Sequence, residues 1–371
     1  MLERQFESGT VDTGGGRRFH TESAGPPDGP LVLLCHGFPE SWYSWRHQLP
    51  ALAGAGYRAV AMDMRGYGRS YAPADVSSYR IDRLVGDCVA VVDALSPGGP
   101  GGPGGPGVTG GPGDRALIVG HDWGAPVAWT AAWLHPDRFR GVVGLSVPFG
   151  ARGLLALPGD PFGARRPSAV QREVAGEGRL FYQEHFHHPD RRAEREAEAG
   201  LRDWLAAALY SFSASPPLPE ALAGVDLSTL ETKAAIDVLR ATMCVPEGAR
   251  LRDLMSLPEG PLSWLTDEDL DFYAAEFART GLTGGFNYYR CVDESWEHLA
   301  DQAGRPLTVP ALHIGGDRDL VTMWSREAAE RAPEVATDHR GTVVLRDCGH
   351  WIQQERPSET NDVLLDFFSD L

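Results

Sequence analysis

The sequence predicts an α/β fold in which a mostly parallel sheet carries helices on both faces and is interrupted once by a helical insertion. Apolar, β-branched runs alternate with helical patterns at both ends of the chain. This alternation is typical of a parallel sheet, because each strand returns to the same edge through a helix. Between these two parts, from about residue 149 to about residue 294, no comparable strand run occurs.

The first part of the chain contains four strand candidates and one clear helix. The strand candidates are "LVLLCHG" (31–37), "YRAVAMDM" (57–64), "RALIVGHD" (115–122) and "FRGVVGLSVP" (139–148). Apolar residues between Ile81 and Leu95 share one helical face. Residues 96–114 consist mostly of glycine and proline, so we expect a surface insertion without a core.

The strand and helix alternation returns in the last part of the chain. Strands are expected at 309–317 and 341–347, and helices at 324–335 and 357–369. We therefore expect a core formed by residues 1–148 and 295–371. Residues 149–294 would form a helical lid, inserted after the sixth strand of the sheet.

Composition restricts the classes of partner. The net charge of −17 argues against nucleic acid, whose phosphates require clustered basic side chains. The N-terminal "MLERQFESGT" lacks the apolar run of a signal peptide, and no apolar stretch is long enough to span a bilayer. The five cysteines are scattered without metal-binding spacing. These features predict a cytoplasmic protein without a membrane partner or a metal.

Four short motifs follow four of the expected strands. They are "HGFP" (36–39), "GHDWG" (120–124), "GDRDL" (316–320) and "CGHW" (348–351). The carboxyl ends of parallel strands meet at one edge of a sheet, and ligands bind there. The chain order of nucleophile, acid and histidine is that of the catalytic triad of α/β-hydrolases. The four motifs together therefore predict one active site.

Asp122 occupies the position in "GHDWG" where an esterase carries its nucleophilic serine. A carboxylate is already ionised at neutral pH and needs no base to become a nucleophile. Its attack on a carbonyl would give a reactive anhydride, whereas attack on a saturated carbon gives a stable alkyl ester. Water activated by His350 would then cleave that ester. Asp122 therefore predicts displacement at an alkyl carbon, in an epoxide or a haloalkane.

The chain resembles a soluble epoxide hydrolase of the α/β-hydrolase fold, of the bacterial type, over nearly its whole length. The segments that carry the resemblance are "HGFPESWYSWRHQLPALAGAGYRAVAMDMRGYGRS", "VGHDWGAPVAW", "GGFNYYR" and "CGHWIQQERP". The resemblance implies an eight-stranded sheet, a helical lid and no cofactor. It also implies that Asp122 is the nucleophile, His350 the general base and Asp319 the acid that orients His350. Asp317 is the second candidate for the acid.

The same resemblance assigns residues around the epoxide. Tyr182 in "YQEHF" and Tyr289 in "FNYYR" would donate protons to the epoxide oxygen, and Tyr288 would serve packing or lie at the rim of the pocket. The backbone N–H groups of Phe38 and Trp123 would form the oxyanion hole during ester hydrolysis. The expected pocket residues are Phe38, Pro39, Trp123, Phe186 and Trp351.

Two alternatives remain open at this stage. A haloalkane or haloacid dehalogenase would use the same aspartate, but haloalkane dehalogenases usually carry Asn at the position of Phe38, and fluoroacetate dehalogenases carry Arg at that of Trp123. A ligand-binding protein without catalysis is the other alternative, and such proteins often lose a catalytic residue. The predicted partner is a small-molecule epoxide, and the assembly is a monomer or a homodimer.

Overall fold

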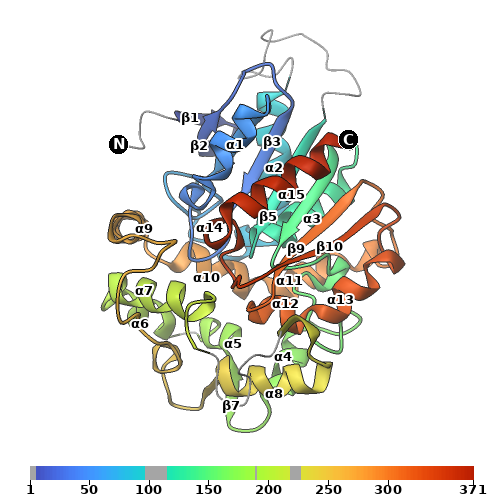
Figure 1. The fold of residues 1–371 in the computed structure, drawn as a ribbon. Coiled ribbons are helices and arrows are strands. Elements are labelled where there is room, and N and C mark those ends of the chain that lie inside the picture. The colour runs from blue at the N-terminus through green and yellow to red at the C-terminus, as the bar shows by residue number, and fades with distance from the viewer. Residues whose placement is uncertain (1–5, 97–114, 189, 218–226) are drawn as a thin grey trace.

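The computed structural model describes residues 6–96, 115–188, 190–217 and 227–371. Within these residues, eight strands form one sheet in the order β1-β2-β4-β3-β5-β6-β9-β10 (Figure 1). The strands are β1 (Glu7–Asp12), β2 (Arg18–Ala24), β3 (Leu31–Cys35), β4 (Arg58–Met62), β5 (Ala116–His121), β6 (Phe139–Leu145), β9 (Ala311–Gly316) and β10 (His339–Leu345). The expected fold class is confirmed.

The sheet is parallel from β4 to β10, and only β2 runs antiparallel to its two neighbours, β1 and β4. The six strand candidates of the sequence correspond to β3, β4, β5, β6, β9 and β10. The sequence analysis assigned no segment to β1 and β2. The edge strand β1, "ESGTVD", is mostly exposed, and β2, "RFHTESA", buries the polar residues His20, Thr21 and Glu22, so neither strand shows an apolar run.

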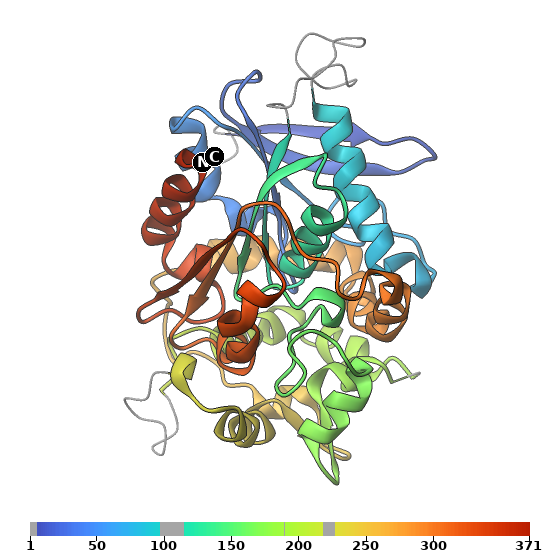
Figure 2. The ribbon, with the colours of Figure 1, turned by 90° about the vertical axis from the view of Figure 1, so that its right-hand side faces the viewer.

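Alternate side chains of the central strands enter two separate cores. Val32 and Leu34 of β3 pack with α1 (Gln48–Gly54) and α15 (Pro357–Ser369). Leu33 and Cys35 belong to the core that includes α2 (Ile81–Leu95) and α3 (Gly124–Leu134). Successive side chains of a strand point to opposite faces of the sheet, so each face has its own core. Helices cover both faces (Figure 2).

Strand ends and one helix differ from the sequence expectation. β3, β4, β5 and β6 each end one to three residues before the end of the corresponding apolar run, and the remaining residues form loops at that edge. The single helix expected at 324–335 is wrong. The chain instead forms α12 (Leu320–Trp324), α13 (Arg326–Arg331) and a 3₁₀ turn that contains Pro333, which cannot continue an α-helix.

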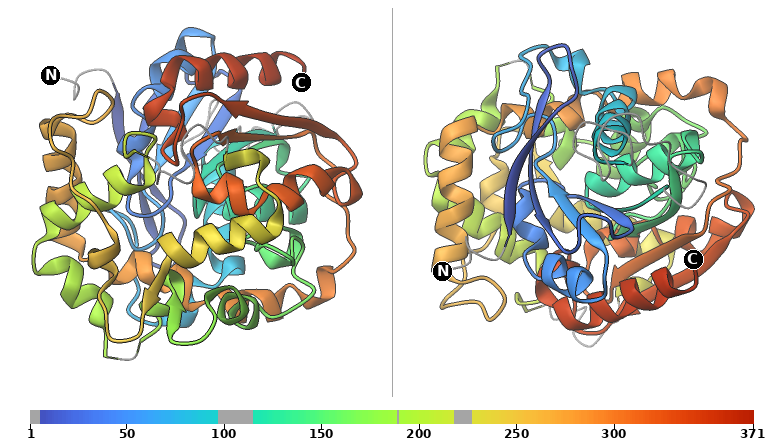
Figure 3. Two further views of the ribbon diagram at one scale, coloured as in Figure 1. Left: turned by 60° about the horizontal axis from the view of Figure 1, so that its bottom comes forward. Right: turned by 90° about the horizontal axis from the view of Figure 1, so that it is seen from above.

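The segment between β6 and β9 lies below the carboxyl ends of the parallel strands in Figure 1 and comes to the front in the left view of Figure 3. Its helices are α4 (Pro167–Ala175), α5 (Tyr182–Phe186), α6 (Arg192–Glu198), α7 (Leu201–Phe212), α8 (Thr232–Thr242), α9 (Asp267–Thr280), α10 (Thr283–Arg290) and α11 (Val292–His298). A small antiparallel pair, β7 (Arg179–Phe181) with β8 (Cys244–Pro246), interrupts them. The sequence analysis missed this pair because three residues carry no periodic pattern.

Two expectations about chain organisation stay predictions. The boundaries of the helical lid at residues 149 and 294 are one of them. The other concerns the Gly/Pro-rich insertion at 96–114, of which residues 97–114 lie outside the described residues. Within the described ranges, no helix combines the length and the apolar character needed to cross a membrane.

A pair of glycine substitutions tests the contact between α3 and β6. A Cβ on Gly144 would lie 2.3 Å from Nε1 of Trp129. We expect Gly144→Ala to lower the free energy of unfolding by about 1–3 kcal/mol, because such overpacking displaces a buried ring. Gly86→Ala in α2 meets no atom within 4 Å, and should raise stability by up to about 1 kcal/mol. Thermal melting measures both, and equal shifts would contradict this account.

Candidate active site

Asp122 lies in a sharp turn between β5 and α3, with a positive φ of 49°. The turn requires glycine on both sides. A Cβ on Gly120 would lie 2.0 Å from the carbonyl oxygen of Gly124, and a Cβ on Gly124 would lie 2.0 Å from that of Cys35. Both distances are far below a van der Waals contact. The Gly-x-Asp-x-Gly pattern therefore follows from the close approach of β3, β5 and α3.

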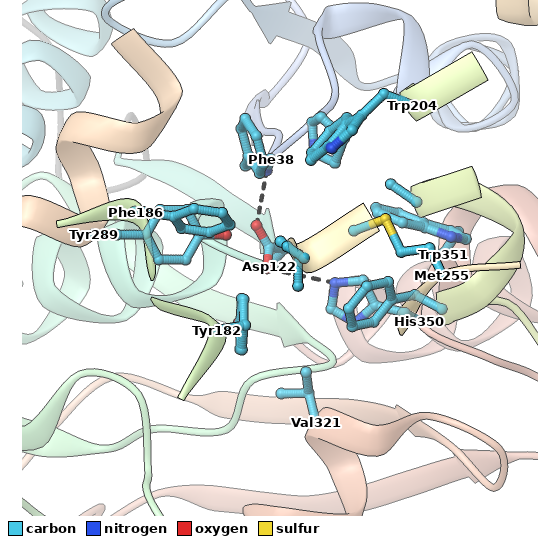
Figure 4. A pocket seen from close by; sticks show the side chains of 14 residues that line it. Phe38, Asp122, Tyr182, Phe186, Trp204, Met255, Tyr289, Val321, His350 and Trp351 are labelled. Atoms are coloured by element: carbon cyan, nitrogen blue, oxygen red, sulfur yellow. Dashed lines mark hydrogen bonds and ion pairs between the residues drawn. The ribbon is translucent and has the colours of Figure 1, made fainter. Parts of the chain in front are cut away.

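Two groups from other parts of the chain bind the Asp122 carboxylate (Figure 4). The backbone N–H of Phe38 donates a 2.7 Å hydrogen bond to Oδ1. Nε2 of His350 lies 3.4 Å from Oδ2. The loop "HGFP" reaches the carboxylate only because Gly37 lacks a side chain: a Cβ there would lie 2.4 Å from Oδ1 of Asp122.

The other ring nitrogen of His350 faces Asp319. Nδ1 lies 3.1 Å from Oδ1 of Asp319, whose side chain is fully buried. Ser146, directly after β6, donates a 2.7 Å hydrogen bond to Oδ2 of Asp319, and its Oγ lies 2.9 Å from Nδ1 of His350. Asp317 instead accepts a hydrogen bond from the backbone N–H of Cys348. Of the two candidate acids, the structure places Asp319 against the imidazole.

The three charged side chains determine one another's protonation. Burial opposes the ionisation of Asp122, but His350 outweighs it and holds the pKa of that carboxyl below its usual value. Burial also opposes charge on His350, but Asp319 and Asp122 prevail and raise the pKa of the imidazole to about 10. At neutral pH the free site therefore contains an imidazolium between two carboxylates.

Tyr182 at the start of α5 and Tyr289 on α10 lie beside Asp122 (Figure 4). Their ring centroids are 6.1 Å apart, and both side chains are buried. Burial, reinforced by the charge of Asp122, raises the pKa of both hydroxyls, so they keep their protons. Nε2 of Gln183 donates to the Tyr182 oxygen at 2.9 Å, which leaves the hydroxyl hydrogen available.

Tyr288 differs from its neighbour Tyr289. Its hydroxyl donates a 2.9 Å hydrogen bond to the carbonyl oxygen of Arg65, a backbone group of the core. The ring packs against Tyr67 and Tyr79. Tyr288 therefore serves the packing of α10.

The cavity beside Asp122 has a volume of about 40 Å³ and is lined mainly by apolar side chains. Phe38, Pro39, Phe186 and Trp351 line it, as expected from the sequence. Trp123 was also expected there, but it is not among the residues that line the cavity; its ring packs edge-on against that of Tyr289, with the ring centroids 5.2 Å apart. The sequence analysis missed the remaining lining residues, Trp204, Ala208, Phe212, Leu251, Met255 and Val321.

Glu40 is a buried carboxylate whose part in the site the sequence analysis missed. It accepts hydrogen bonds from the Gly37 N–H at 3.2 Å and from Nδ1 of His121 at 2.7 Å. The amides of Gln353 and Gln354 donate to its other oxygen. Glu40 thereby joins the "HGFP" loop, the turn at Asp122 and the segment after His350. Glu40 directly follows the "HGFP" motif, but the sequence could not show its role because most of its partners are distant in the chain.

Glu355 fixes the loop that carries His350. Its carboxylate accepts hydrogen bonds from the backbone N–H groups of Gly349 (3.1 Å), Trp351 (3.0 Å) and Ala214 (2.8 Å). The last of these follows α7, and the His350 N–H also donates to the carbonyl of Phe212 at the end of that helix. Hydrogen bonds therefore attach the loop that carries His350 to the end of α7.

Within the described part of the chain, no group of His, Cys, Asp and Glu side chains could hold a metal ion.

Comparison with known proteins agrees with this geometry. The family model of the alpha/beta hydrolases matches residues 32–363. Epoxide hydrolase B of Mycobacterium tuberculosis is 52% identical over 360 residues, which cover 96% of each chain. The chain belongs to the epoxide hydrolases of the alpha/beta hydrolase family.

Solved structures of epoxide hydrolases share the fold. The enzyme from an endophytic Streptomyces superposes with a TM-score of 0.80 at 42% identity, covering 99% of this chain and 96% of that one. Epoxide Hydrolase A from Mycobacterium thermoresistibile gives a TM-score of 0.79 at 38% identity, with 98% of both chains covered. These likenesses extend over the sheet and over the helical segment between β6 and β9.

The pKa of His350 tests which acid supports it. We expect Asp319→Asn to lower that pKa, because it removes the nearest carboxylate charge on Nδ1. Asp317→Asn, the matched change two residues earlier, should leave it unchanged, because Asp317 bonds to Cys348 instead. NMR titration of the His350 imidazole measures both values. If the pKa of His350 fell only in the Asp317→Asn variant, Asp317 and not Asp319 would be the acid that supports His350.

Proposed function

We propose that this protein converts an epoxide and water to a vicinal diol through an alkyl ester on Asp122. The observation that carries the proposal is a carboxylate at the nucleophile turn that faces a histidine on one side and two proton-bearing tyrosines on another. The names of the relatives support the same reaction class. Proton donors suit an epoxide, because its oxygen leaves as an alkoxide, whereas a halide requires no proton.

In the first half-reaction, Oδ2 of Asp122 attacks an epoxide carbon. Oδ1 is held by the Phe38 N–H and becomes the ester carbonyl oxygen. The carbon–oxygen bond of the ring breaks, and Tyr182 or Tyr289 gives its proton to the departing oxygen. The tyrosinate so formed recovers a proton from the His350 imidazolium, which leaves His350 neutral.

Ester formation prepares His350 for the second half-reaction. Esterification removes the negative charge of Asp122, one of the two anions that raise the pKa of His350. The imidazole can then remain neutral and take a proton from water, while Asp319 holds its orientation. The hydroxide attacks the carboxyl carbon of Asp122, and negative charge develops on Oδ1. The Phe38 N–H, together with the Trp123 N–H at the start of α3, stabilises that charge.

Release of the diol restores the starting state. The intermediate collapses, the ester oxygen leaves as an alkoxide that takes a proton from the His350 imidazolium, and the new carboxyl group of Asp122 returns its proton to the imidazole. Protons and charges therefore balance over one cycle of epoxide plus water to diol.

Trapping the ester tests the nucleophile. We expect His350→Gln to retain attack by Asp122 but to lose water activation, so that the ester accumulates. The variant is mixed with styrene oxide as substrate and the reaction is quenched rapidly. Mass spectrometry should then show the peptide containing Asp122 heavier by one substrate molecule. As a control, Asp122→Asn in the same background should carry no added mass. An unmodified peptide in a variant that still consumes the epoxide would contradict the proposal.

Removal of the tyrosine hydroxyls tests the proton donors. Loss of one catalytic hydrogen bond costs about 10²–10³ in rate, and a second donor limits the loss in either single Tyr→Phe variant. We therefore expect the double variant of Tyr182 and Tyr289 to be slower in alkylation than either single variant, with hydrolysis of a preformed ester almost unchanged. Stopped-flow fluorescence separates the two steps.

Tyr288→Phe is the matched control, because its hydroxyl is bonded to the Arg65 carbonyl and faces no substrate. It should alkylate at close to the parent rate. A double variant that opens epoxides as fast as the parent protein would exclude the two tyrosines as donors. Faster release of halide than of diol by the parent protein would favour a dehalogenase.

A further inference from the structure

Two buried glutamines form a chain of hydrogen bonds that ends on the hydroxyl of Tyr182. Gln171 lies on α4, and Gln183 directly follows Tyr182 on α5; both glutamines are buried. Nε2 of Gln171 donates a 2.7 Å hydrogen bond to Oε1 of Gln183. Nε2 of Gln183 in turn donates a 2.9 Å hydrogen bond to the Tyr182 oxygen. Because a buried amide costs free energy unless it is hydrogen-bonded, the chain holds Gln183 against Tyr182.

The direction of these bonds determines what the Tyr182 hydroxyl can do. A side-chain amide accepts hydrogen bonds on its oxygen and donates them from its nitrogen. Gln171 occupies the oxygen of Gln183, so the nitrogen of Gln183 faces the phenol, and the Tyr182 oxygen is an acceptor there. The hydroxyl hydrogen of Tyr182 is therefore not bound by Gln183. The same bond lowers the pKa of Tyr182, against the increase that burial and Asp122 cause.

The bond from Gln183 becomes stronger when Tyr182 loses its proton. As Asp122 forms the ester, its negative charge passes to the departing epoxide oxygen, and protonation of that oxygen converts the tyrosine to a tyrosinate. A hydrogen bond to an anion is about twice as strong as one between neutral groups. Gln183 therefore stabilises the products of proton transfer more than the reactants, which is the condition for an increase in rate.

We propose that Tyr182 is the tyrosine that gives its proton to the epoxide oxygen, and that Gln183 is a positioning residue that prepares it for this transfer. The inference rests on the proposed function and specifies the source of the proton. The O–H bond of Tyr182 breaks as an O–H bond forms on the opened epoxide, and the amide hydrogens of Gln183 stay on its nitrogen. Tyr289 keeps its proton and donates a hydrogen bond to the same epoxide oxygen.

Removal of the Gln183 amide tests this role through the alkylation rate. Gln183→Met keeps the length of the side chain and removes the donor. We expect alkylation to slow about tenfold, less than after loss of a donor that touches the substrate itself, with hydrolysis of the preformed ester unchanged. Gln302→Met removes an exposed amide that accepts from Arg305, and as a control it should alkylate at the parent rate. Stopped-flow fluorescence with styrene oxide measures both steps.

A double-mutant cycle separates an action through Tyr182 from a general effect on packing. In a Tyr182→Phe background the amide has no phenol oxygen to bind, so Gln183→Met should cause no further loss of alkylation. In a Tyr289→Phe background the full loss should persist. Tyr182→Phe alone should also be slower than Tyr289→Phe alone. Equal losses from Gln183→Met in both backgrounds, or a slower Tyr289→Phe variant, would overturn the proposal.

Titration of a fluorinated tyrosine separates this proposal from the proposed function. Difluorotyrosine at position 182 ionises at lower pH than tyrosine, because fluorine withdraws electron density, and its phenolate absorbance reports the pKa without a substrate. We expect Gln183→Met to raise that pKa by about 1, and to leave unchanged the pKa of the same label at position 288.

The sign of this change decides the outcome. A raised pKa supports the role of Gln183 even in a protein that opens no epoxide. A lowered pKa would show that Gln183 accepts the hydroxyl hydrogen, and an unchanged pKa would show that the two groups are not bonded. Either of these results overturns the inference, and in an enzyme that converts epoxides to diols it leaves the proposed reaction in place.

Discussion

The ion pair between Asp122 and His350 is the contact on which the site depends. It joins the turn after β5 to the loop after β10, which are separated in the sequence by the whole helical segment between β6 and β9. A single ion pair would be weak if it were exposed to water. Here burial increases its strength and also its cost, so the surrounding protein must compensate both charges.

That compensation explains much of the polar architecture around the pair. Asp319 and Ser146 bind Nδ1 of His350, the Phe38 N–H binds Asp122, and Glu355 binds the backbone on both sides of His350. Glu40 and His121 form a second buried pair, and Nε2 of His121 bonds to the carbonyl of His350. Each buried charge at the site therefore has several partners, which reduces the freedom of the base before any substrate binds.

The helical segment contributes to the base as well as to the pocket. The end of α7 accepts the His350 N–H and donates to Glu355 through Ala214, while Nε1 of Trp351 donates to the carbonyl of Leu209. The same helix places Trp204, Ala208 and Phe212 in the cavity wall. The wall that contacts a substrate is thus attached to the loop of the base, and the two elements hold each other in place.

The sequence by itself determined the parts of the site that depend on local geometry. The glycines around Asp122 are needed for backbone approach, six apolar runs gave six strands, and the four motifs meet because parallel strands end at one edge. Tertiary structure decided what depends on distant partners. It placed Asp319 against His350 in preference to Asp317, packed Trp123 edge-on against Tyr289, and brought Glu40, Ser146 and Glu355 into position. A strand or turn is specified by neighbouring residues, whereas the face that a lid helix or a loop side chain presents is set by packing across the whole molecule.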